Sequence, residues 1–434
     1  MVDIFESLRA EISSIGISTH IGRVAEVARG TVVVTGLALV ARQGDRVLIG
    51  GSLGGEVLNL STTGLTVLTD SAPDGVAMGT KVTLRGASGI SPDHSWIGRI
   101  VDPYGRPLDG RPLLRGTAMC SVRNDAPAAA GRRRLGKRLS TGVAIFDTML
   151  PLVKGQRIGL FAGSGVGKSS LLAKFARGIE ADVVVIALIG ERGRELREFV
   201  EKVLGPEGMK RSVIVAATSD QSATSRRRCA LAAMSVAEHF RDQGQHVLFL
   251  ADSITRFAEA HREVALAAGE QPALRGYPPS VAQAIMSLAE RAGPGPQDMG
   301  DITAVFSVLV AGSDMEETVA DILRGVLDGH VVMDRKIAER GRYPAIDLLR
   351  SVSRSLPDAA SVDENVLIAK ARALLGAWDR AEMMIQAGLY AKGSDPMVDA
   401  AIRVWPALDA FLAEDARDGV SGSFKRLDAV LAVK

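Results

Sequence analysis

The sequence predicts an α/β protein made of three parts: a small N-terminal β-barrel, a central domain built on a parallel sheet, and a C-terminal helical domain. Short β-rich runs fill residues 18–90, apolar runs alternate with helical stretches from Ser140 to Leu356, and apolar residues recur at helical spacing after Ser361. With 434 residues the chain is also too long for one hydrophobic core.

The composition excludes several classes of protein. The chain is 47% hydrophobic and 24% charged, as folded globular proteins are, while a net charge of +2 and 4% aromatic residues argue against nucleic-acid binding. The two distant cysteines, Cys120 and Cys229, form neither a disulfide framework nor a zinc site, so we expect a cytoplasmic protein. There is no signal-peptide pattern and no run of roughly 18–20 apolar residues, so any membrane role is expected to be peripheral.

Residues 1–17 are predicted to form a short amphipathic helix. Ile4, Phe5, Leu8, Ile12 and Ile15 fall near one face at helical spacing. Such a helix either packs on its own domain or docks a partner, and the sequence leaves both open.

Residues 18–90 are predicted to form the barrel, because a closed sheet hides its edges. Its short β-rich runs read GRVAEVARGTVVVTG, DRVLIG, GEVLNLS, TGLTVLTD and TKVTLRG. In the following segment IGRIVDPYGRPLDG reads as strand and turn. The basic stretch GRRRLGKR at 131–138 reads as a solvated connector, with contact to anionic lipid or nucleic acid as the alternative.

The central domain is expected over residues 91–357, including this connector. Its apolar runs are RIGLFAG, DVVVIALIG, RSVIVAAT, HVLFLAD, DITAVFSVLVAG and GHVVMD. Continuous apolar strands bounded by helices predict a parallel sheet covered on both faces. Residues 358–434 are expected to form the helical domain.

The stretch AGSGVGKS at 162–169 meets the phosphate-binding pattern G-x-x-x-x-G-K-[ST] except at Ala162. Glycines let backbone N–H groups turn toward phosphates, Lys168 can reach the β- and γ-phosphates, and the Ser169 hydroxyl can bind Mg²⁺. The helix that follows directs the positive end of its dipole at the anion. The predicted nucleotide-binding residues of the loop are Gly163, Ser164, Gly165, Val166, Gly167, Lys168, Ser169 and Ser170.

Acidic residues follow two of the predicted strands. Asp252 ends HVLFLAD and is expected to hold Mg²⁺ from its second shell, or to cap the helix that follows. Glu191 is the first charge after DVVVIALIG and could polarise an attacking water, with Arg192 and Glu195 close by. The alternative for this group is a solvated, charge-rich start of a helix.

Two residues far along the chain complete the candidate set. Arg354 could neutralise charge on a transferred phosphoryl group, in its own subunit or in another, although spacing alone favours a surface ion pair. Tyr343 could stack on adenine or simply pack.

These motifs together resemble a known family. TGVAIFDTMLPLVKGQRIGLFAGSGVGKSSLL is similar to the catalytic core of rotary ATPase β-type subunits, and IGERGRELREF, LFLADSITRFAEAHREVALAAGE, GYPPSVAQAIMSLAERAG and RYPAIDLLRSVSR continue the likeness in order. The chain resembles above all the flagellar type III export ATPases, over roughly residues 18–400, and AGLYAKGSDPMVDAAI is similar to their C-terminal domain. The resemblance implies a RecA-like P-loop ATPase domain that uses ATP and Mg²⁺.

The resemblance also implies a role for each candidate. Lys168 and Ser169 match the phosphate lysine and the magnesium hydroxyl, and Asp252 matches the Walker B aspartate. Glu191 matches the carboxylate that activates water, with Arg192 as its neighbour. Tyr343 matches the aromatic residue beside adenine, and Arg354 matches the arginine finger that reaches the nucleotide of a neighbouring subunit. Ala162 agrees with the family, whose loops also begin with alanine.

The partners implied by the resemblance are those of an export machine. They are further copies of the chain in a hexameric ring, a stator-like regulator at the N-terminal helix, a coiled-coil stalk protein and chaperone–substrate complexes at the C-terminal domain, and an export gate at the inner membrane, where the cytoplasmic ATPase would be peripherally associated. Nucleic acid is not expected.

Four rival functions stay open. A virulence-type secretion ATPase shares every motif. An ATP synthase β-type subunit would need a second, different subunit, and the chain is short for one. An RNA translocase like the Rho terminator would need exposed aromatics, and residues 18–90 contain no Phe, Tyr or Trp. A non-hydrolysing nucleotide-binding subunit would lack the carboxylate at Glu191.

Overall fold

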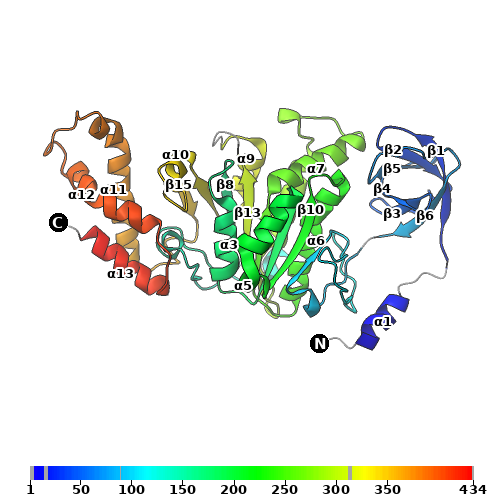
Figure 1. Cartoon of the computed structure of the whole chain (residues 1–434), viewed down its shortest axis with the longest axis horizontal. Helices are drawn as coiled ribbons and strands as arrows, with labels where there is room; N and C mark the ends of the chain where they lie inside the picture. Colours follow the sequence, from blue (N-terminus) through cyan, green and yellow to red (C-terminus); the bar gives the residue numbers. More distant parts are fainter. Residues whose placement is uncertain (1–3, 14–17, 88, 311–314, 433–434) are drawn as a thin grey trace.

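The computed structural model describes residues 4–13, 18–87, 89–310 and 315–432. Its three parts lie in a row in Figure 1, with a β-barrel at one end, a sheet with flanking helices in the middle and a helical part at the other end. The predicted fold class is therefore confirmed.

The barrel is closed by six antiparallel strands in the order β1-β2-β5-β4-β3-β6, with β6 pairing back to β1. They are β1 (Ile21–Val27), β2 (Thr31–Thr35), β3 (Arg46–Ile49), β4 (Leu53–Leu60), β5 (Leu65–Thr69) and β6 (Lys81–Gly86). Burial alternates along β2 and β5, as period-2 side chains require. The interior is filled by aliphatic side chains such as Val34, Ile49 and Val67, which suit a barrel without aromatic residues.

Helix α1 (Ile4–Ser13) precedes the barrel and lies apart from it in Figure 1. Of the apolar face predicted for residues 1–17, Phe5, Leu8 and Ile12 are 73%, 48% and 67% exposed. Ile15 and the two ends of that segment lie outside the described residues. Exposure of these three side chains favours the docking alternative over packing against the chain's own domain.

The central sheet has the order β15-β14-β8-β13-β11-β9-β10-β7, and β12 pairs with β13. All six predicted strands are present: β8 (Arg157–Ala162), β9 (Val183–Glu191), β10 (Ser212–Thr218), β11 (Val247–Asp252), β13 (Asp301–Leu309) and β14 (Gly329–Met333). They are parallel to one another, whereas the added strands β12 (Gly293–Pro294) and β15 (Ile346–Ser353) are antiparallel. Strand β7 (Arg99–Val101), within the stretch IGRIVDPYGRPLDG that is predicted as strand and turn, extends the sheet beside β10.

Both faces of the sheet are covered. Along β9, Val184 and Ile186 join one hydrophobic cluster while Val183 and Val185 join the other. Helix α3 (Lys168–Gly178) packs in the first cluster through Phe175. The second cluster contains α6 (Ala223–Asp242), α7 (Ile254–Ala267), α8 (Ser280–Arg291) and α9 (Thr318–Val326). Shorter helices are α2 (Ala144–Thr148), α4 (Gly193–Glu198), α5 (Gly205–Met209) and α10 (Arg335–Glu339), and a π-helical turn (Phe199–Leu204) joins α4 to α5.

The basic stretch at 131–138 is exposed along most of its length, as expected for a solvated connector, but that expectation is wrong for Arg132 and Arg138, which are half-buried. Arg132 donates to the carbonyl of Ala292 at 3.2 Å, and Arg133 donates to Asp301 at 2.5 Å. Arg138 donates to the carbonyls of Asp147 and Thr148, each at 2.8 Å. These arginines satisfy backbone carbonyls at loop and helix ends, which sequence composition does not reveal.

The C-terminal part consists of α11 (Val362–Gln386), α12 (Pro396–Leu412) and α13 (Gly419–Leu431). Ser361 and Glu364 form a capping box that starts α11. Trp378 and Trp405 stack with ring centroids 4.8 Å apart, and the helices share the hydrophobic cluster of α3. None of the helices in the described part of the chain has the length and apolarity that a membrane crossing requires.

Candidate active site

The phosphate-binding pattern forms the turn between β8 and α3. Gly165 and Gly167 have φ of +78° and +87°, a conformation that side chains with a Cβ rarely adopt. Ala162 is the last residue of β8, fully buried, and pairs with Leu309 and Met333 on the neighbouring strands. Because Ala162 has strand conformation, its methyl group does not disturb the turn that follows.

Lys168 and Asp252 form an ion pair at the start of α3. Their side chains are 11% and 4% exposed, and the Ser307 hydroxyl also donates to Asp252 Oδ1 at 2.8 Å. Asp252 ends β11, two strands away from β8, with β13 between them. Ser253, not Asp252, caps α7, because the Ser253 side chain accepts from the N–H of Arg256. The interpretation of Asp252 as a helix cap is therefore wrong.

Glu191 lies at the end of β9, where the pairing with β10 shifts register. Gly190 takes a φ of +70° at this irregularity, which re-aims the strand end as β-bulges do. Burial, and after it the negative charge of Asp252, raise the pKa of Glu191 to about 7 against the opposing charge of Lys168. A carboxylate with a pKa near neutrality is suited to taking up a proton.

Arg192 and Glu195 start α4 beside Glu191. Arg192 Nη1 donates to Glu195 Oε1 at 3.2 Å, and the two side chains are 77% and 39% exposed. Both residues line the same cavity as Glu191. The charged start of α4 therefore borders the same cavity as Glu191, and the two alternatives for this group are compatible.

A cavity of about 1170 Å³ joins these groups, and we call it the P-loop cavity. Of the predicted residues it is lined by Gly163, Ser164, Gly165, Gly167, Lys168, Ser169, Ser170, Glu191, Arg192 and Glu195. Val166 is buried beneath the loop, and Asp252 reaches the cavity through Lys168.

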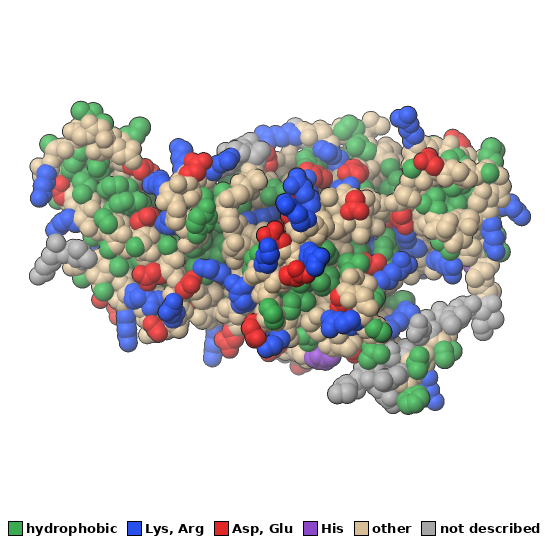
Figure 2. All heavy atoms as spheres, in the orientation of Figure 1, with side chains coloured by type: hydrophobic (Ala, Val, Ile, Leu, Met, Phe, Trp, Pro, Cys, Tyr) green, Lys and Arg blue, Asp and Glu red, His purple; other side chains and the backbone are tan. Residues whose placement is uncertain are grey.

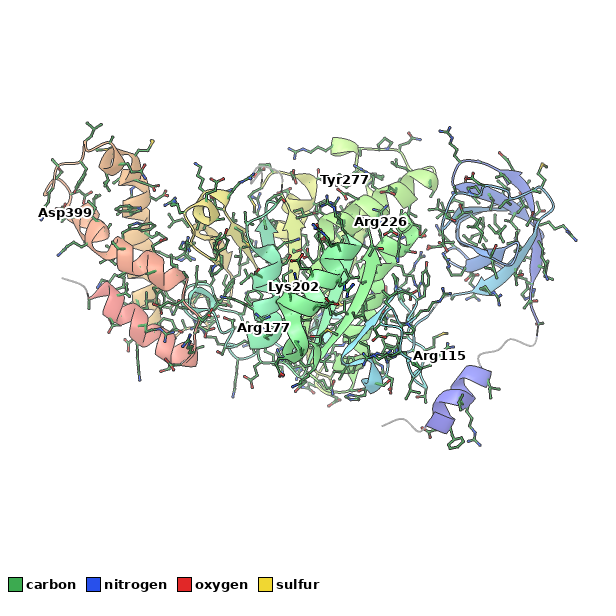
Figure 3. All side chains as sticks on the ribbon, viewed as in Figure 1. Arg115, Arg177, Lys202, Arg226, Tyr277 and Asp399 are labelled. Carbon is green, nitrogen blue, oxygen red and sulfur yellow. The ribbon has the colours of Figure 1, made fainter. Side chains whose placement is uncertain are left out.

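The cavity is also lined by residues that the sequence patterns do not identify. Arg226 and Tyr277, labelled in Figure 3, lie at the same edge of the sheet, and Arg256 and Arg275 join them. Arg256 stands four residues after Asp252 at the start of α7, a spacing that could have identified it. Arg226 is in the first turn of α6 and pairs with Glu263 at 2.9 Å, a tertiary contact with no local signal.

Tyr343 and Arg354 do not line the cavity. The Tyr343 ring lies against the loop, since a Cβ built on Gly167 would be 3.2 Å from it, and the side chain is 49% exposed. Arg354 is exposed just past β15, and its guanidinium donates to the carbonyl of Arg324 at 3.2 Å. One chain therefore assembles the P-loop cavity without Arg354.

The residues present fit a nucleotide with Mg²⁺. The glycine turn and Lys168 suit phosphates, and the cavity is large enough for a nucleoside triphosphate. Within the described residues, no three His, Cys, Asp or Glu side chains gather closely enough to hold a metal by themselves. Mg²⁺ is commonly held by one or two protein oxygens together with phosphates, and the Ser169 hydroxyl that borders the cavity is an oxygen of that kind.

Comparison with known proteins agrees with this geometry. The ATP synthase alpha/beta family, nucleotide-binding domain, matches residues 142–353, and the T3SS EscN ATPase C-terminal domain matches residues 361–426. The flagellum-specific ATP synthase of Caulobacter vibrioides is 43% identical over 439 residues, covering 98% of this chain and 99% of its own.

Two solved structures are similar over nearly the whole chain. The assembled ATPase EscN of the enteropathogenic E. coli type III secretion system has a TM-score of 0.88 at 33% identity, covering 95% of this chain and 100% of its own. EscN in complex with its central stalk EscO has a TM-score of 0.86 at 34% identity, with the same coverage. Because this likeness extends over barrel, P-loop domain and C-terminal helices alike, the chain belongs to the family of type III secretion ATPases, which includes the flagellum-specific ATP synthases.

Proposed function

We propose that the chain hydrolyses ATP to energise or gate the export of flagellar proteins through a type III secretion apparatus. The observation that carries this proposal is the convergence of Lys168 and Glu191 on one cavity, with Asp252 paired to Lys168, in a chain similar over its full length to flagellum-specific ATP synthases. A P-loop alone supports nucleotide binding, whereas the buried carboxylate of Glu191 adds a group able to accept a proton.

In this proposal the loop residues 163–170 bind the phosphates of ATP. Lys168 exchanges the Asp252 carboxylate for phosphate oxygens, and the Ser169 hydroxyl and Asp252 hold Mg²⁺, with Glu195 as a weaker candidate. Mg²⁺ held there would supply positive charge that stabilises the phosphate groups. Tyr343, against Gly167, is placed to contact adenine at the edge of the loop.

Glu191 orients the attacking water and accepts its proton, and Arg192 assists beside it. The raised pKa of Glu191 makes the carboxylate basic enough to take the proton near neutral pH. Replacement of Glu191 by Gln is expected to preserve ATP binding and abolish turnover. Retained turnover would remove Glu191 from this role.

Arg354 is proposed to act on the ATP of a neighbouring subunit, because its own chain places it outside the P-loop cavity. A homo-hexameric ring with heterologous contacts would bring each Arg354 to the next subunit's site. Specific activity is then expected to fall when the protein is diluted through its assembly transition. Constant activity per subunit on dilution contradicts the shared site.

The proposed partners follow the family. The C-terminal helices are proposed to contact a coiled-coil stalk protein, as EscN is in complex with its central stalk EscO, and to receive chaperone–substrate complexes. Helix α1 is proposed to dock a stator-like regulator that brings the cytoplasmic ATPase to the export gate at the inner membrane. Removal of residues 1–17 is expected to abolish regulator binding and leave the fold intact, whereas an unfolded truncation would mean that α1 packs on its own domain.

The decisive experiment replaces the chromosomal copy with the Glu191→Gln variant and scores swimming motility and filament export. We expect loss of both with normal amounts of the protein, and Lys174→Ala on α3 serves as the control. Normal filaments with loss of effector secretion would identify a virulence-type export ATPase instead. A ring that requires a second kind of subunit would identify a rotary ATP synthase β-type subunit.

A further inference from the structure

A second cavity, of about 490 Å³, lies where the barrel meets the central domain, and we call it the junction cavity. Strands β3, β4 and β6 supply one wall, and the loop after β7 supplies the other. It shares no lining residue with the P-loop cavity. Figure 2 shows Lys and Arg side chains gathered between the barrel and the central domain.

The side chains at this cavity carry an excess of positive charge. Four guanidinium groups and one carboxylate line it or lie beside the ring of its tyrosine: Arg46, Arg85, Arg106, Arg228 and Asp70. A second carboxylate, that of Asp102, accepts from the backbone N–H groups of Tyr104 and Arg106, each at 2.8 Å, so the guanidinium groups still outnumber the carboxylates. The Asp70 carboxylate is already engaged, because Arg46 Nη1 donates to Asp70 Oδ1 at 3.0 Å and Thr224 donates to the same oxygen at 3.1 Å. Neither Arg85 nor Arg106 forms an ion pair with a described residue.

Tyr104 lies among these cations. The guanidinium carbons of Arg228, Arg46 and Arg106 lie 4.9, 5.0 and 5.8 Å from the centre of its ring. Burial lowers the pKa of Arg228 to about 10. Arg228 is buried and Arg46 is half-buried, so their guanidinium groups repel one another across the ring with little screening by water. An anion beside them would relieve that repulsion.

The cavity is shaped by a glycine as well as by charge. A Cβ built on Gly54 would lie 2.8 Å from Arg46 Nη2 and 2.3 Å from Asp70 Oδ2. The absence of a side chain on β4 therefore lets the Arg46–Asp70 pair lie flat against the strand. The pair joins β3 to the end of β5, and Thr224 ties it to α6 of the central domain.

We propose that the junction cavity binds a polyvalent phosphate anion, held by Arg85 and Arg106 with Arg46 behind them. The planar guanidinium fork matches phosphate oxygens, and one univalent ion would leave part of the positive charge uncompensated. Arg85 belongs to the barrel and Arg106 to the loop after β7, so a bound phosphate links the two domains. Binding there stabilises the docked barrel by mass action and does not depend on ATP turnover.

Calorimetric titration of the full chain with inorganic pyrophosphate tests the proposal. In a Lys168→Ala background, which removes the P-loop lysine, we expect one bound pyrophosphate per chain. Arg85→Gln and Arg106→Gln should each weaken this binding about tenfold, the loss expected for one charge-assisted contact. Arg29→Gln, an exposed arginine in the turn between β1 and β2, is the matched control and should change nothing.

A second titration with pyrophosphate uses the wild-type P-loop in place of the Lys168→Ala variant. The wild-type chain should bind two pyrophosphate ions, and the double replacement of Arg85 and Arg106 by Gln should bind one. A parallel titration with ADP tells a nucleotide from a free phosphate as the occupant. A single pyrophosphate site in the wild-type chain overturns the proposal, and so does a loss of pyrophosphate affinity in Arg29→Gln equal to that in Arg85→Gln or Arg106→Gln. Impaired assembly of Arg106→Gln, in a protein whose junction cavity binds no pyrophosphate, also overturns it.

Discussion

Two buried ion pairs in the central domain have the same chemistry and different surroundings. Arg291 and Glu238, 2% and 5% exposed, are enclosed by further partners: Arg291 donates to Ser235 at 2.8 Å and Asn124 donates to Glu238 at 2.8 Å. Lys168 and Asp252 are also buried, but among the described residues Asp252 has one further hydrogen-bond partner, Ser307.

The two pairs differ in whether a charged side chain can leave its partner for a ligand. The pair of Arg291 and Glu238 also holds the carbonyl of Val122, so it fastens the segment before the basic stretch to α6 and α8. Lys168 borders a cavity of about 1170 Å³ and can leave Asp252 for a phosphate. A fully partnered pair stabilises the domain, whereas an incompletely partnered pair beside a cavity is available to a ligand.

The largest expected effect is on ATP turnover, and it concerns Arg354, the positive charge that does not line the P-loop cavity of its own chain. Arg354→Ala should lower turnover by about 10³–10⁵-fold and leave ATP binding intact, as expected for an arginine finger. Steady-state ATPase assays of the assembled protein measure this, with the exposed Arg335→Ala as control.

Mixed assemblies then show where Arg354 acts. Arg354→Ala and Glu191→Gln chains, inactive alone, should regain activity when combined at equal amounts, because about a quarter of random interfaces contain both native residues. No recovery in mixtures that do assemble places Arg354 in its own subunit's site.

The next largest effect concerns the enclosed pair. Arg291→Ala leaves the Glu238 carboxylate buried without its main partner, so the free energy of unfolding should fall by about 3–5 kcal/mol. Urea denaturation measures the loss, and Arg197→Ala, in an exposed pair with Glu201, should leave the free energy of unfolding nearly unchanged. Equal losses in the two variants would contradict the structural role of the enclosed pair.

A smaller effect is expected from the pair at the cavity. Lys168→Ala should reduce turnover by about 10²–10³-fold, the loss typical of one preorganised charge at a reacting group. Lys174→Ala, on the same helix and in an exposed pair with Asp415, should keep full activity. If Lys168→Ala instead destabilises the chain as much as Arg291→Ala while keeping turnover, the two pairs have the same role.

The smallest effect is a dependence on pH. The folded chain keeps a proton on Glu191 up to a pKa of about 7, whereas the unfolded chain releases it near the ordinary value of 4.5, so stability should fall as pH rises between these values. Glu191→Gln should remove this fall, so the melting temperature of the variant minus that of the wild type should increase as pH rises across that range. Wild-type turnover should rise through about pH 7, where the carboxylate becomes available as a base. A melting-temperature difference that is constant with pH would falsify the assignment of this pKa to Glu191.

Much of the fold was predictable because its signals are local. The six central strands are continuous apolar runs, and the loop at 162–169 combines glycines with Lys168 and Ser169 within eight residues. Glu191 and Asp252 were found because parallel strands bring their carboxyl ends to one edge, which makes the first charge after a strand a site candidate.

The rest depended on contacts between distant segments. The places of β7 and β15 at the two ends of the sheet, the docking of Arg132, Arg133 and Arg138, and the approach of Arg226 and Tyr277 to the P-loop cavity join residues far apart in sequence. The interpretation of the basic stretch as solvated is wrong at Arg132 and Arg138, because arginine donates to backbone carbonyls of the fold as readily as it faces water.

The class of chemistry is encoded locally, since a phosphate loop needs only a few residues of fixed type at fixed spacing. The local sequence also encodes which segments become strands, because burial on both faces requires unbroken apolar runs. Which charged side chains meet depends on the packing of distant segments. That packing paired Lys168 with Asp252 beside a cavity, enclosed Arg291 with Glu238, and left Arg354 outside its own chain's site. Such pairings depend on strand order and helix packing, which no local pattern encodes.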